Sequence, residues 1–90
     1  MKIIKNENYK LVVIENDVEI EYYDFEREIT FSNLTKNLLQ RNLDSKIELN
    51  IDETIEFTEE ENNLVSIVKE IITNYNNKVE EFDKFKNNFE

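Results

Sequence analysis

The chain has 90 residues, with 21 acidic against 11 basic side chains and no histidine, which gives a net charge of −10. It also contains no glycine, proline or cysteine. These absences exclude disulfides, thiolate nucleophiles, histidine general bases and the glycine-rich loops that bind phosphate. Apolar residues make up 39% of the chain, which is enough for a small core. We therefore expect one domain over residues 1–90, with no cofactor, no bound metal and no catalytic activity.

A β-hairpin is predicted near the N-terminus. Residues 9–14 are mostly apolar and β-branched, and residues 18–25 largely alternate between apolar and acidic side chains, so both segments are typical of strands. Asn16 and Asp17 lie between them and tolerate the positive φ angles of a two-residue turn. This turn determines four cross-strand pairs, two on an apolar core face and two on an outer face. The core pairs are Val13 with Ile20 and Leu11 with Tyr22, and the outer pairs are Val12 with Glu21 and Ile14 with Glu19.

The middle of the chain is predicted to add a helix and further strands. Residues 28–31 are predicted to be a short strand that ends before Ser32, a favourable N-cap residue. Residues 33–43 carry leucines at helical spacing and are predicted to be a helix of about three turns. Residues 46–57 alternate between apolar and polar side chains, which predicts either one bent strand or a second hairpin.

The C-terminal third is predicted to be one long helix. Thr58 and Glu61 can form a capping box, and no glycine or proline interrupts residues 59–89. The apolar residues of this helix recur at alternating intervals of four and three, the spacing of a heptad seam. They are Leu64, Val68, Ile71, Tyr75, Phe82, Phe85 and Phe89, with Lys78 at the interrupted position. We expect the first half to pack on the sheet and the tail from Val79 onward to overhang the domain. The predicted fold is thus α+β, with a small antiparallel sheet packed by a short helix and a long C-terminal helix.

The negative charge is concentrated in two segments. Residues 15–28 carry a net charge of −6 and residues 44–61 a net charge of −7, so the rest of the chain carries +3. Both segments are predicted to be mainly strands and turns, and their outward carboxylates would share one face of the sheet. We predict that this face binds a partner. Its residues are Glu19, Glu21, Asp24 and Glu26 in one half, Glu48, Asp52, Glu53 and Glu56 in the other, and Tyr23 as an exposed aromatic contact.

The predicted acidic face would attract a basic groove, and proteins that bind nucleic acid present grooves lined with lysine and arginine. In its length, its α+β pattern and its acidic clusters at residues 19–21 and 59–61, the chain resembles the small acidic inhibitors encoded by phages and mobile elements, including anti-CRISPR proteins and DNA mimics. The resemblance implies a stoichiometric inhibitor in the cytoplasm of a bacterial host cell, which blocks the nucleic-acid-binding groove of a nuclease complex. Immunity proteins that neutralise a toxin nuclease also use an acidic surface against a basic target, and they are an open alternative.

Two other classes of function are alternatives to an inhibitor, namely an assembly module and a carboxylate enzyme. A structural or assembly module would form a homodimer through apolar residues of the C-terminal helix, namely Tyr75, Phe82, Phe85 and Phe89. A carboxylate enzyme would use an acidic pair, but the pairs present lack the spacing of a calcium loop and are typical of solvated faces. These pairs are Glu19 with Glu21, Asp52 with Glu53, and Glu80 with Glu81. Direct binding to nucleic acid or a membrane is not expected, because the net charge repels phosphate and no apolar stretch approaches the ~20 residues that span a bilayer.

Overall fold

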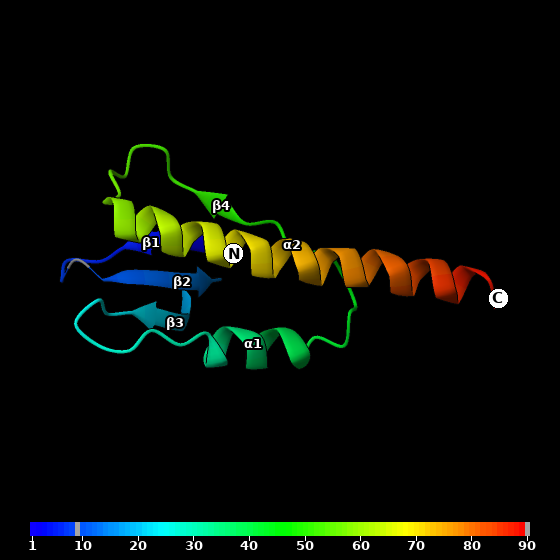
Figure 1. Ribbon diagram of the computed structural model, residues 1–90. Coiled ribbons are helices and arrows are strands. Elements are labelled where there is room, and N and C mark those ends of the chain that lie inside the picture. The colour runs from blue at the N-terminus through cyan, green and yellow to red at the C-terminus, as the bar shows by residue number, and fades with distance from the viewer. Residues whose placement is uncertain (9, 90) are drawn as a thin grey trace.

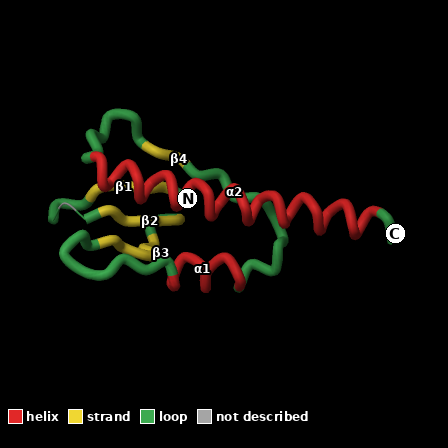
Figure 2. Tube along the Cα trace, in the orientation of Figure 1, coloured by secondary structure: helices red, strands yellow, loops and turns green. Residues whose placement is uncertain are grey.

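A computed structural model describes residues 1–8 and 10–89 and has an α+β architecture, with one sheet and two helices (Figure 1). Figure 2 shows the same arrangement by element type, with the long helix running across the sheet and the short helix beside it. The elements in chain order are β1 (Lys2–Lys5), β2 (Leu11–Glu15), β3 (Val18–Tyr23), α1 (Ser32–Leu39), β4 (Asn50–Ile51) and α2 (Glu59–Asn87). The predicted fold class is therefore confirmed.

The sheet is mixed, and its strand order is β3-β2-β1-β4. β1 pairs antiparallel with β2 and parallel with β4, so the sheet is antiparallel over β3, β2 and β1, as expected of the sheet, but not at β4. β1 was not predicted, because its apolar pair Ile3 and Ile4 is too short to show a strand pattern. Its central position in the sheet separates β3 from β4, which form the two edges.

The hairpin turn has the predicted residues, but the register beyond it differs from the prediction. Asn16 and Asp17 have φ angles of 51° and 63°, as a two-residue turn requires, and Ile14 lies opposite Glu19. A β-bulge then leaves Ile20 without a partner in the ladder. It shifts every later pair by one residue. The observed pairs are Val13 with Glu21, Val12 with Tyr22 and Leu11 with Tyr23.

Three predicted segments are shorter than expected or have a different structure. Residues 28–31 form no strand, and residues 46–57 contribute only β4, because the side chain of Asp52 accepts hydrogen bonds from Thr54 and turns the chain after Ile51. β3 ends before residues 24 and 25, and Tyr9, the first residue of the predicted first strand, lies outside the described residues. α1 ends at Leu39 because the backbone enters the left-handed region at residues 42 and 43, with φ angles of 55° and 58°.

α2 begins with the predicted capping box. The Thr58 hydroxyl accepts a hydrogen bond from the Glu61 N–H, and the Glu61 carboxylate accepts one from the Thr58 N–H at 2.8 Å. The helix packs on the sheet together with α1, through a core that both helices and the inward-pointing strand residues share. The largest fully buried members are Tyr23, Ile3, Leu11, Leu34, Val13, Val68 and Val79.

The segment between α1 and β4 is held against α2 by one side chain. The Ile47 N–H donates to Asn76 Oδ1 at 2.7 Å, and Asn76 Nδ2 donates to the Ile47 carbonyl at 2.8 Å. Val79, one turn further along α2, is the last buried residue of the helix. Beyond it α2 extends away from the sheet, and the molecule measures 50 × 24 × 23 Å (Figure 1).

Candidate functional site

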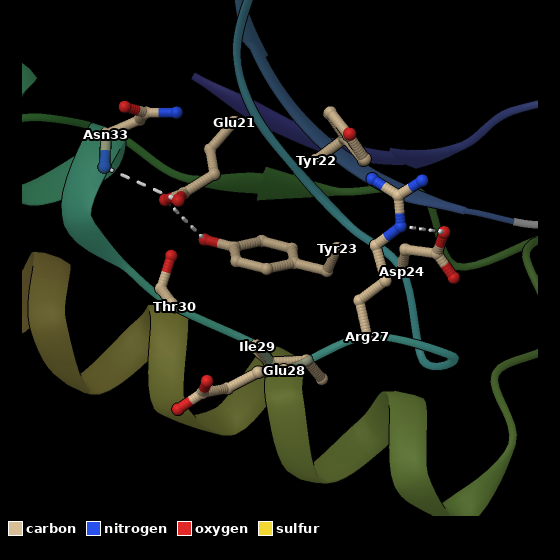
Figure 3. A pocket seen from close by; sticks show the side chains of 9 residues that line it. All are labelled: Glu21, Tyr22, Tyr23, Asp24, Arg27, Glu28, Ile29, Thr30 and Asn33. Atoms are coloured by element: carbon tan, nitrogen blue, oxygen red, sulfur yellow. Dashed lines mark hydrogen bonds and ion pairs between the residues drawn. The ribbon is translucent and has the colours of Figure 1, made fainter.

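Two of the residues predicted to form the binding face are buried. Glu21 and Tyr23 are 5% and 1% exposed, because the bulge in β3 turns both side chains toward the core. Figure 3 shows the Glu21 carboxylate between the start of α1 and the Tyr23 hydroxyl. It accepts hydrogen bonds from the N–H groups of Leu34 at 3.0 Å and Asn33 at 3.4 Å, and from the Tyr23 hydroxyl at 3.3 Å. The prediction that these two residues face outward is therefore wrong.

Glu21 takes the capping role that was predicted for Ser32. Ser32 is the first residue of α1, and the N-cap residue Phe31 provides no side-chain hydrogen bond to the helix. The free N–H groups at the start of α1 are satisfied instead by a carboxylate from the neighbouring strand, which also suits the helix dipole. Burial and the nearby Glu21 carboxylate raise the pKa of Tyr23 above its ordinary value, so the hydroxyl stays protonated and donates.

Asp24 is tied into the surface by local contacts. The Glu26 N–H donates to it at 3.0 Å, Lys10 Nζ lies 3.5 Å away and Arg27 Nε 3.7 Å away. The hydrogen bond from the Glu26 N–H, followed by the charges of Lys10 and Arg27, holds the pKa of Asp24 below its ordinary value. A hollow of about 190 Å³ lies beside it, lined on one side by Arg27 and by Tyr22, which the bulge leaves exposed (Figure 3).

The two halves of the predicted acidic face belong to opposite edges of the sheet. Glu19 lies on β3 and Glu26 shortly after it, whereas Glu48 and Asp52 flank β4 at the opposite edge of the sheet. Because two strands lie between these edges, they are about 14 Å apart. The remaining predicted binding residues are exposed: Glu19, Glu26, Glu48, Asp52, Glu53 and Glu56.

Another grouping of acidic residues follows from the end of the molecule at which α2 begins. Three parts of the chain lie at this end (Figure 1), namely residues 5–8 with 10, residues 24–28 and residues 52–61, and together we call them the acidic end. Ion pairs connect them, with Lys5 Nζ 2.9 Å from Glu61 and Lys10 Nζ 3.5 Å from Asp24. The acidic end carries ten carboxylates against three cations, and thus a net charge of −7 out of −10.

Seven of these carboxylates are exposed and have no ion-pair or hydrogen-bond partner among residues 1–8 and 10–89. Three of the seven are Glu7, Glu26 and Glu28, and the other four follow one another closely along the chain up to the start of α2. They are Glu53, Glu56, Glu59 and Glu60. Asp52 is also exposed, but hydrogen bonds from the hydroxyl and N–H of Thr54 lower its pKa and orient it within the turn. Glu59 and Glu60 were not among the predicted binding residues, although the three consecutive glutamates of the capping box were a visible signal.

The exposed tail of α2, together with the turn of residues 88–89 that follows it, carries three of the four residues predicted to contact a second copy. Phe82, Phe85 and Phe89 are 37%, 59% and 76% exposed. The rings of Phe85 and Phe89 lie against each other, with centroids 4.7 Å apart. Tyr75 differs from them because it is buried in the core of its own chain. Its hydroxyl has no hydrogen-bond partner within the described part of the chain.

An apolar groove of about 330 Å³ lies between α1 and α2, and it was not predicted from the sequence. Its α1 side is built by Thr35, Leu38, Leu39, Asn42 and Leu43, and its α2 side by Ile71, Tyr75 and Lys78. Leu39 is largely exposed on the wall of the groove. The signal for it was present, since a short helix with leucines at two adjacent positions cannot direct both into one core.

Within the described residues the structure shows no metal site, and the comparisons show no relative. In the part of the chain that the structure describes, no three acidic side chains come together in a way that could hold a metal ion. Within the same residues, no helix is both long and apolar enough to cross a membrane. Comparisons of the chain with protein-family models, with curated proteins and with solved structures found no match.

Proposed function

We propose that this protein is a non-enzymatic inhibitor that places its acidic end in the basic nucleic-acid-binding groove of a nuclease or nuclease complex. The observation that carries the proposal is a run of four exposed, unpaired glutamates that lie close together along the chain at this end, Glu53, Glu56, Glu59 and Glu60. Like charges this close together along the chain repel one another and cost stability, so a partner explains their presence better than solubility alone does. The binding surface differs from the face predicted from the sequence, because Glu21 and Tyr23 are buried.

The distribution of charge along the molecule supports the same proposal. The acidic end carries −7, whereas residues 78–87 at the other end carry three acidic and three basic side chains and are neutral. A molecule with its charge at one end is drawn to a basic groove with that end leading, which speeds productive encounter. Grooves that bind nucleic acid are lined with lysine and arginine for the phosphates, and carboxylates held by the chain could replace those phosphates.

Two quadruple variants test the proposal. The acidic-end variant carries Glu53→Gln, Glu56→Gln, Glu59→Gln and Glu60→Gln. The dispersed variant carries Asp44→Asn, Glu70→Gln, Glu80→Gln and Asp83→Asn, which removes the same charge from exposed positions elsewhere. Circular dichroism first establishes that both fold. Each protein is then immobilised and exposed to a bacterial lysate freed of nucleic acid, and bound proteins are eluted with salt or with duplex DNA.

We expect the natural protein and the dispersed variant to retain a nucleic-acid-binding protein that salt and duplex DNA both displace. The natural protein, when added to the eluted protein, should then block its DNA binding or cleavage. The acidic-end variant should neither retain that protein nor inhibit it. Equal retention by the two variants, or retention that DNA cannot compete, would contradict the proposal. The identity of the retained nuclease separates an inhibitor of a CRISPR effector from an immunity protein against a toxin.

A further inference from the structure

The apolar groove and the exposed tail of α2 belong to one continuous stripe. Ile71, Tyr75 and Lys78 line the groove, and Phe82, Phe85 and Phe89 continue the stripe onto the tail. Successive members are separated by four and three residues in alternation, which is the heptad spacing of helices that pair along a seam. One half of the stripe is thus a hollow with an apolar lining, and the other half is a row of protruding rings.

The two halves are complementary to each other when a second copy runs antiparallel. In heptad terms Tyr75, Phe82 and Phe89 occupy a positions, and Ile71, Lys78 and Phe85 occupy d positions. Antiparallel helices place a positions of one copy opposite d positions of the other. One register then aligns all three rings with the groove: Phe82 opposite Lys78, Phe85 opposite Tyr75, and Phe89 opposite Ile71.

The charges at the centre of this register are also complementary. Lys78 and Glu81 form an ion pair within one chain, with Nζ 3.3 Å from the carboxylate. The same register brings Lys78 of each copy next to Glu81 of the other, so two ion pairs would meet at the twofold axis. The register also places the Phe82 ring of one copy opposite Lys78 of the other. A lysine can lie favourably against this ring, because Lys86 Nζ lies 5.1 Å from the Phe82 centroid within one chain.

We propose that two copies of this chain form an antiparallel dimer in which the tail of each α2 lies in the α1–α2 groove of the other. The interface is isologous, so the contact between tail and groove occurs twice. Leu39 forms the outer wall of each groove and covers the incoming rings. The overlap of residues 71–89 spans about 28 Å of helix, so two molecules of 50 Å would give a dimer of roughly 70 Å. The two acidic ends would lie at its opposite tips.

Sedimentation or light scattering of variants tests both sides of the contact. Phe85→Asp changes the tail, and Leu39→Asp changes the groove. As controls, Asn87→Asp places the same side chain at the end of α2 and Gln40→Asp places it directly after α1, both at exposed positions away from the stripe. We expect the natural chain and both controls to be dimers, and Phe85→Asp and Leu39→Asp each to weaken the dimer by at least about tenfold. Phe85 and Leu39 contribute little to the core, so circular dichroism should show all four variants folded.

The antiparallel orientation is tested by distances between spin labels. The chain has no cysteine, so single labels at Ser66→Cys and Lys84→Cys are unambiguous. The proposed register separates the two copies of position 84 by about 12 Å along the axis and the two copies of position 66 by about 42 Å. Equal distances at the two positions would show a parallel pair and overturn the proposal. A monomer at every concentration would also overturn it. So would a dimer that Leu39→Asp leaves intact, because the groove would then lie outside the interface. The acidic-end variant should still dimerise, which keeps this proposal separate from the proposed function.

Discussion

At the scale of single residues, the most informative position is Glu21. The sequence places it among outward carboxylates, but the structure buries it beside the first turn of α1. Its carboxylate accepts hydrogen bonds from Leu34, Asn33 and Tyr23, and these three donors compensate for the burial of its charge. A residue counted from the sequence as part of a binding surface is thus a structural link between β3 and α1.

Replacing Glu21 by alanine should destabilise the fold. The change leaves two N–H groups of α1 and the Tyr23 hydroxyl without their acceptor in a buried site. We expect the free energy of unfolding to fall by about 2–4 kcal/mol in chemical denaturation. Glu21→Gln keeps one acceptor oxygen and should cost less. The matched control is Glu19→Ala, an exposed glutamate on the same strand, which should change stability by less than about 0.5 kcal/mol. Equal effects at positions 19 and 21 would contradict the structural role.

At the scale of elements, Glu61 joins the start of α2 to β1. Its carboxylate closes the capping box with Thr58 and lies 2.9 Å from Lys5 Nζ at the end of β1. Burial by itself raises the pKa of Glu61. The hydrogen bonds from the Thr58 N–H, the Lys5 ammonium and the Thr58 hydroxyl outweigh this effect and hold the pKa below its ordinary value. The folded state therefore favours the ionised form of this residue.

This lowered pKa predicts a pH-dependent contribution to stability. A group whose pKa is lower in the folded state stabilises the fold above its ordinary pKa of 4.5, and the contribution is lost as the pH falls through the folded value. We expect Glu61→Gln to lower the free energy of unfolding by about 1–2 kcal/mol at pH 7. The difference from the natural protein should shrink below pH 4.5. Glu60→Gln is the control, because it makes the same change at an exposed position of the same turn. A difference that persists unchanged in acid would contradict this account.

At the scale of the whole molecule, the main feature is a charge that is high and lies mostly at one end. The acidic end holds −7 of the net −10, and the neutral tail of α2 lies at the other extreme of a molecule 50 Å long. Repulsion among exposed glutamates opposes folding and is screened by salt over about 10 Å at 0.1 M ionic strength.

Sodium chloride should therefore raise the melting temperature by a few degrees between low and moderate salt. The acidic-end variant should lose most of this salt dependence, because it removes four of the most closely spaced charges. The dispersed variant should retain more of it, although its net charge is the same. Thermal unfolding followed by circular dichroism measures the difference. A melting temperature that falls with salt, or an equal response of both variants, would show that repulsion at the acidic end is unimportant for stability.

The sequence by itself determined the features that depend on neighbours along the chain. Thr58 and Glu61 are three residues apart and close their capping box without help from the rest of the fold. Asn16 and Asp17 likewise form their turn from local φ preferences. The amount of negative charge, the length of α2 and the α+β class follow from composition and periodicity in the same way.

Only the tertiary structure decided which surfaces these elements form. The bulge at Ile20 turns Glu21 and Tyr23 inward, where Tyr23 packs on the Phe31 ring with centroids 5.3 Å apart and Glu21 meets the start of α1. These contacts join residues that are 8 to 13 positions apart in the chain, so the local sequence pattern of β3 does not predict them. β1 inserts between β2 and β4 and thereby places β3 and β4 at opposite edges of the sheet, with an acidic segment beside each. Register and strand order depend on the free energy of the whole core, because a shift of one residue exchanges the two faces of a strand.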